Sequence, residues 1–75
     1  MDARDLIRRG QRAALLEKIS ILEAQIGNAC AAITVHSYDG LGIENVDADK
    51  VLQAAQDLKA AKDEWARLKA QLEAL

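Results

Sequence analysis

The residues of this chain that could do chemistry are few and scattered. Its 75 residues include one histidine, His36, and one cysteine, Cys30, and no glycine-rich phosphate loop. Nucleophilic catalysis needs a nucleophile, a base and an orienting group, and a metal site needs several ligands at matched spacing. No such set can be assembled, so we expect no enzyme activity, no cofactor and no metal site. We expect Cys30 to be a small buried residue.

One short stretch has the spacing of a calcium loop. Asn45, Asp47 and Asp49 alternate as the first ligands of such a loop do. The loop also needs a glycine at about its sixth position and a bidentate glutamate at about its twelfth. Lys50 and Gln56 occupy these positions, so the stretch does not predict calcium binding.

A basic cluster near the start of the chain is the first candidate binding surface. It consists of Arg4, Arg8, Arg9 and Arg12. Positive charge at the start of a helix opposes the helix dipole, so we expect compensation from Asp2, Asp5 and the C-terminal end of the chain. This charge matching is the simplest interpretation. The alternative is a contact with an acidic protein surface or with RNA, and RNA is less favoured because no aromatic residue is expected beside the cluster.

The second candidate surface is a long connection between two predicted helices. Helix–helix turns commonly take about 2 to 5 residues, whereas residues 36–47 form this one. The apolar residues Tyr38, Leu41 and Ile43 alternate with acidic residues along it. Two interpretations remain open: these side chains bind a partner, or they fold back and plug the open end of the helical assembly.

Two hydrophobic seams predict the architecture that carries these residues. Both have steps of three and four residues, which are typical of helices packed side by side. We expect Asp2 to cap a helix over 2–35 and Asp47 to cap a helix over 48–75. The prediction is a single all-α domain, an antiparallel two-helix coiled-coil-like hairpin. The seams are Leu15, Ile19, Leu22, Ile26, Ala29 and Ile33, then Val51, Ala54, Leu58, Ala61, Trp65, Leu68, Leu72 and Leu75.

A second apolar line on the first helix predicts self-association. It lies on roughly the opposite side from the seam and is interrupted only by Asn28. A helix that is apolar on two sides is buried on both, and two helices alone have almost no core. We therefore expect two hairpins to dimerise into a four-helix bundle. The expected dimer interface is Ile7, Ala14, Ile21 and Val35.

Charge predicts how the two hairpins are arranged. Residues 36–49 contain four carboxylates and no lysine or arginine, whereas the opposite end of each hairpin is basic. An antiparallel homodimer would place Arg4, Arg8 and Arg9 of one subunit near the acidic end of the other. We expect that arrangement.

Composition narrows the class of protein. Hydrophobic residues make up 51% of the chain, aromatic residues 3%, and proline is absent, which favours long helices. The net charge of -2 argues against general polyanion binding. No basic, apolar leader with a cleavage site opens the chain, and the apolar segment 19–35 is shorter than the roughly 20 residues that a membrane span needs. Its single cysteine cannot form a disulfide within the chain, which fits the reducing cytoplasm, so we expect a cytoplasmic protein. We expect no membrane partner.

The segment from Gly40 to Trp65 resembles the small helical-hairpin phosphatases that act on aspartyl-phosphorylated response regulators of sporulation relays. The similar residues are Val51, Leu52, Gln56, Leu58 and Trp65. The resemblance covers about a third of the chain. It departs from the family where Ala55 replaces the serine and Lys59 the motif aspartate, so it implies a regulator without phosphatase activity. The predicted shape also resembles plasmid-encoded hairpin dimers that bind paired RNA loops.

The sequence thus predicts a small, non-enzymatic homodimer that binds another protein, still unidentified, as an adaptor or an inhibitor of the kind that phages and mobile elements encode. An RNA-binding dimer is the first alternative. A degenerate phosphatase-like regulator is the second.

Overall fold

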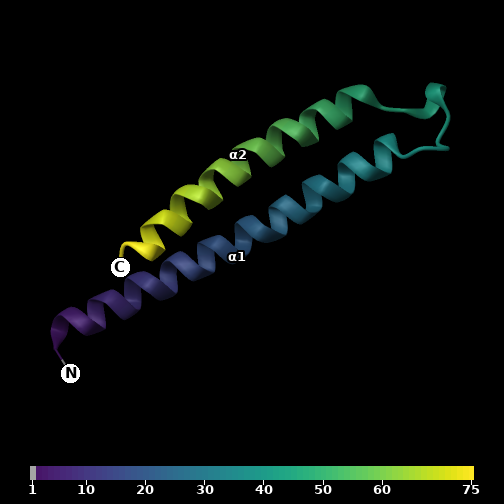
Figure 1. The fold of residues 1–75 in the computed structure, drawn as a ribbon. Helices are drawn as coiled ribbons and strands as arrows, with labels where there is room; N and C mark the ends of the chain where they lie inside the picture. Colours follow the sequence, from purple (N-terminus) through teal and green to yellow (C-terminus); the bar gives the residue numbers. More distant parts are fainter. Residues whose placement is uncertain (1) are drawn as a thin grey trace.

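Within residues 2–75, two long helices are connected through a short 3-10 helix (Figure 1). The computed structural model describes residues 2–75. Helix α1 spans Ala3–Ser37, the 3-10 turn η1 spans Ile43–Asn45 and helix α2 spans Ala48–Glu73. The helices run antiparallel in a rod with extents of 62 × 14 × 14 Å. The all-α helical hairpin expected from the sequence is the observed architecture.

Each helix begins beside the aspartate expected to cap it. The Asp2 carboxylate accepts a hydrogen bond from the Arg4 backbone N–H at 3.2 Å, and the Asp47 carboxylate accepts one from the Lys50 N–H at 3.1 Å. Both bonds satisfy donors that the first turn of a helix leaves free. Helix α2 ends at Glu73, two residues before the expected end at residue 75.

Helix α1 continues past Val35, its predicted last residue, and stops at Ser37. His36 therefore lies in the last turn of α1 and not in the connection. The Asp47 N–H donates to the His36 carbonyl at 3.2 Å. Because the last carbonyls of a helix have no partner within it, this bond supports the extra turn. The connection is correspondingly shorter, residues 38–47.

The seam between the helices holds the buried side chains. Ile19, Ala29, Ala54 and Leu68 are buried. The other seam residues are half-buried, except Leu75, which is 45% exposed. A pair of helices covers only one stripe on each, so most of the large seam side chains still touch solvent.

Helix α1 extends beyond the end of α2 (Figure 1). Gln11 and Leu15 line a hollow together with Gln71 and Leu75, so the end of α2 lies level with these α1 residues. The preceding turns of α1, residues 3–10, have no helix of the same chain beside them, and we call them the overhang. Among residues 2–75, neither helix offers a stretch long and apolar enough to cross a bilayer.

Candidate interaction surfaces

The connection has a defined shape that its own hydrogen bonds maintain. The Leu41 N–H donates to the Tyr38 carbonyl at 3.2 Å, and the Asn45 side-chain amide donates to the Leu41 carbonyl at 3.1 Å. Gly40 and Gly42 have φ values of 95° and 90°, which glycine adopts without the steric cost of a side chain. The turn end of the hairpin is therefore an ordered surface.

The three apolar residues expected to bind a partner at this end have different surroundings. Leu41 is half-buried. Tyr38 is 50% exposed and Ile43 is 92% exposed, the latter at the start of η1. Val46, in the same connection, is 41% exposed. The plug interpretation thus fits Leu41, whereas Tyr38 and Ile43 remain accessible.

The basic cluster lies at the opposite end of the molecule. Arg4, Arg8 and Arg9 are on the overhang, and all four arginines of the cluster are exposed. Among residues 2–75 the ion pairs are Lys50 with Asp47, Lys59 with Asp63 and Arg67 with Glu64, so none of them involves the cluster. The charge compensation expected from the end of α2 does not reach Arg4, because α2 ends about two turns short of it.

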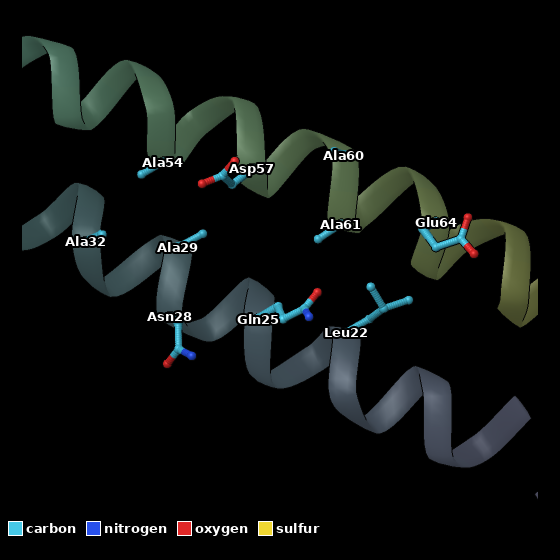
Figure 2. Close-up of a pocket in the computed structure, with 10 residues that line it drawn as sticks. All are labelled: Leu22, Gln25, Asn28, Ala29, Ala32, Ala54, Asp57, Ala60, Ala61 and Glu64. Carbon is cyan, nitrogen blue, oxygen red and sulfur yellow. The ribbon is translucent and has the colours of Figure 1, made fainter. Parts of the chain in front are cut away.

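Three hollows lie along one flank of the hairpin. The largest, about 600 Å³, includes Gln25, Asn28, Asp57 and Glu64. In Figure 2 the methyl groups of Ala29 and Ala61 face across the gap between the helices, whereas Asn28 projects away from it. Residues that line successive hollows are seven positions apart in the sequence, and residues at this spacing lie on the same side of a helix. Their lining residues include Gln11, Lys18 and Gln25, then Ala14, Ile21 and Asn28 on α1, and Asp57, Glu64 and Gln71 on α2.

We call this side the open flank. Its α2 part was not identified from the sequence, although the seven-residue spacing of Asp57, Glu64 and Gln71 could have indicated it. Two of the residues expected at the dimer interface, Ala14 and Ile21, line its hollows. The large members of the expected interface are solvent-exposed in the single chain: Ile7 by 60%, Ile21 by 53% and Val35 by 60%.

The other flank is closed by Trp65. Its indole N–H donates to the Glu23 carboxylate at 3.3 Å, and the Lys69 ammonium lies 5.6 Å from the ring centre. Glu23 follows Ile21 by two residues, which places it on nearly the opposite side of α1. The tryptophan thus has the Glu23 carboxylate at its indole N–H and the Lys69 ammonium over its ring, so one seam residue carries both an apolar ring and polar contacts.

On the open flank, Glu64 and Arg67 form an ion pair that shifts the pKa of both groups. Hydrogen bonds from Arg67 lower the pKa of Glu64, and those bonds raise the pKa of Arg67 in turn. Lys18, on the facing helix, adds a weaker favourable charge to Glu64. The pair fixes the position of one acidic group beside the hollow lined by Lys18 and Ile21.

Cys30 corrects a sequence prediction, because it is exposed and not buried. It lies beside the seam rather than on it, and two helices cover only the seam itself. Within residues 2–75, no three His, Cys, Asp or Glu side chains gather as metal ligands would.

Comparison with known proteins gives no family for this chain. No protein-family model, curated protein or solved structure matches it. The resemblance to the phosphatase hairpins therefore depends on the five similar residues of α2 alone.

Proposed function

We propose that this chain is a non-enzymatic protein-binding module that acts as a homodimer of hairpins in a four-helix bundle. It would serve as an adaptor or an inhibitor of a larger protein in the cytoplasm, where reducing conditions keep the exposed Cys30 thiol free. The observation that supports the proposal most is Ile43, a large apolar side chain that is 92% exposed on an ordered connection.

The ordered connection favours binding for an energetic reason. A flexible loop loses conformational entropy when it binds, whereas a loop already held by hydrogen bonds loses less. Here the Asn45 N–H donates to the Gly42 carbonyl at 3.0 Å, and the Val46 N–H to the Ile43 carbonyl at 3.2 Å. Ile43 is thus presented in a fixed position.

The chemistry of the turn end favours one kind of partner. Tyr38 and Ile43 would enter an apolar pocket, because large exposed side chains of this type act as anchors at interfaces. Asp39 and Glu44 beside them would favour lysine or arginine at the rim of that pocket. The expected partner surface is therefore an apolar pocket with a basic border.

A photo-crosslinking residue introduced at position 43 tests this proposal in a lysate of the native host. The matched control carries the same residue at position 52, because Leu52 is also exposed, by 59%, but lies on α2, outside the connection. We expect one protein to be crosslinked from position 43 and not from position 52. An excess of the chain without the crosslinking residue should compete for this protein and reduce the crosslink. Ile43→Ser should abolish its capture without loss of helicity, and Leu52→Ser should not.

Two outcomes contradict the proposal. Capture that does not depend on Ile43 would remove the turn end as the binding surface. Nuclease-sensitive capture that survives Ile43→Ser but is lost when the four arginines of the basic cluster become alanine would support the RNA-binding alternative.

A further inference from the structure

The exposed apolar line of α1 is symmetric about its central residue. Ile7 and Val35 lie fourteen residues before and after Ile21, and Ala14 and Asn28 lie seven residues before and after it. When two identical helices pack antiparallel around a two-fold axis, residues equidistant from the axis meet each other. With the axis at Ile21, Ile7 would meet Val35 of the second copy, and Ile21 would meet its own equivalent.

The charges agree with the same register. Arg4 and Asp39 lie seventeen and eighteen residues on either side of Ile21, so they would come to one level at each end of the assembly. The hydrogen bond between the Asp47 N–H and the His36 carbonyl puts Asp47 beside the end of α1. That end would face the overhang of the second copy. The basic overhang of each copy would thus lie against the acidic end of the other.

The hollows occur at the matching levels. One is lined by Ala14, one by Ile21 and one by Asn28. In the symmetric register, Asn28 of the second copy would face the hollow at Ala14, and Ala14 of the second copy would face the hollow at Asn28. Hollows between helices that receive side chains of a facing helix are the usual geometry of helix bundles.

We propose that the occupant of the open flank is a second copy of this chain, docked with α1 antiparallel to α1 and a two-fold axis at Ile21. This interface rests on the self-association proposed above and specifies its face and register. The second copy covers Ile7, Ile21 and Val35, and it supplies the overhang with the neighbour that α2 does not provide. Ile43 lies beyond the end of the facing α1, so the turn end stays free for another partner.

Distances between spin labels in the full-length chain test the register. With Cys30→Ser removing the native thiol, labels are attached in separate variants, Ser37→Cys and Ala24→Cys. The axis at Ile21 places the two residues 37 about 48 Å apart along the bundle, at a rise of about 1.5 Å per residue. It places the two residues 24 within about 20 Å of each other. Parallel hairpins would give short distances for both labels, which would overturn the proposal.

Two substitutions test the face. Ile21→Glu should raise the dimer dissociation constant by more than about a hundredfold, because it buries a pair of unpaired charges at the axis. Leu16→Glu is the matched control. Leu16 is 45% exposed and lies seven residues before Glu23, which places it on the closed flank of the same helix, so the dimer of this variant should persist. Sedimentation equilibrium measures both. Loss of the dimer in Leu16→Glu would overturn the assigned face.

Charge exchange tests the ends independently of the apolar centre. Each of two single variants, Arg4→Asp and Asp39→Arg, should weaken the dimer by about tenfold at low salt. In the symmetric dimer, each substitution creates a like-charge pair between positions 4 and 39 at both ends. Mixing the two variants should restore wild-type affinity, because both pairs in the mixed dimer are then opposite in charge. Failure of the mixture to recover would overturn the register. A wild-type chain that sediments as a helical monomer would overturn this interface and the proposed homodimer together, whereas a dimer with different label distances would overturn the interface alone.

Discussion

The indole N–H of Trp65 donates to the carboxylate of Glu23 at 3.3 Å, which connects residues 42 positions apart in the sequence. Glu23 is the only charged residue between Ile19 and Val35. The bond gives this carboxylate a partner on α2 and holds the indole across one flank of the seam. The closed flank therefore results from a contact between the two helices.

Trp65→Ala should lower the free energy of unfolding by about 2 kcal/mol, less than a fully buried tryptophan would cost, because Trp65 is only half-buried. Trp65→Phe keeps an aromatic ring at the seam but loses the hydrogen-bond donor, so its cost should be about 1 kcal/mol. Urea denaturation followed by circular dichroism, at one fixed protein concentration, measures both. Equal costs for the two variants would mean that the bulk of the indole does not stabilise the seam.

Ala54→Leu should destabilise the hairpin. Ala29 and Ala54 are seam residues on facing helices, and they are only 8% and 7% exposed. A larger side chain at such a buried position forces the helices apart, at a cost of about 1–3 kcal/mol. The neighbouring Ala55 is exposed, so Ala55→Leu should change stability by less than about 0.5 kcal/mol. Thermal unfolding of the two variants should separate them clearly, and similar melting temperatures would contradict the buried position of Ala54.

Gly27→Ala should stabilise the protein by about 1 kcal/mol, because glycine is a poor helix former and an alanine loses less entropy on folding. A Cβ at Gly27 would meet nothing within 4 Å. Gly40→Ala should have the opposite sign, since the φ of 95° at Gly40 is unfavourable for a residue with a side chain. Denaturant midpoints measure the two effects. A loss of stability in Gly27→Ala would show that this side of α1 is more crowded than the single hairpin indicates.

Glu64 should titrate below its ordinary pKa of 4.5, because the Arg67 guanidinium donates hydrogen bonds to its carboxylate. A carboxyl group whose pKa is lowered by folding stabilises the folded state above its unfolded pKa. That contribution is lost as the pH falls through the lowered value. The effect on stability should be small because both groups are exposed to solvent. A nuclear magnetic resonance titration should show the Glu64 pKa rising in Arg67→Ala, and an unchanged value would exclude the proposed cause.

The helices, their caps and the seam could be predicted from the sequence because they depend on residues that are close to one another along the chain. Residues spaced by three and four along one chain lie on one side of a helix wherever that helix is placed. Asp2 and Asp47 cap their own helices through donors only two and three residues away. The end of α1 was less predictable, because its last turn is supported by Asp47, eleven residues beyond His36.

The amino-acid sequence by itself determined that this chain forms two antiparallel helices, with an acidic connection at one end and arginines at the other. Only the tertiary structure decided which flank of the seam is closed, how far α1 extends past α2, and which residues of the connection are exposed. These features depend on the axial position and rotation of one helix against the other. Because the apolar residues of the seam are similar to one another, the seam alone does not select one placement of the helices. Specific contacts between the helices, such as the hydrogen bond from Trp65 to Glu23, select it. The periodicity within one helix contains no information about such contacts.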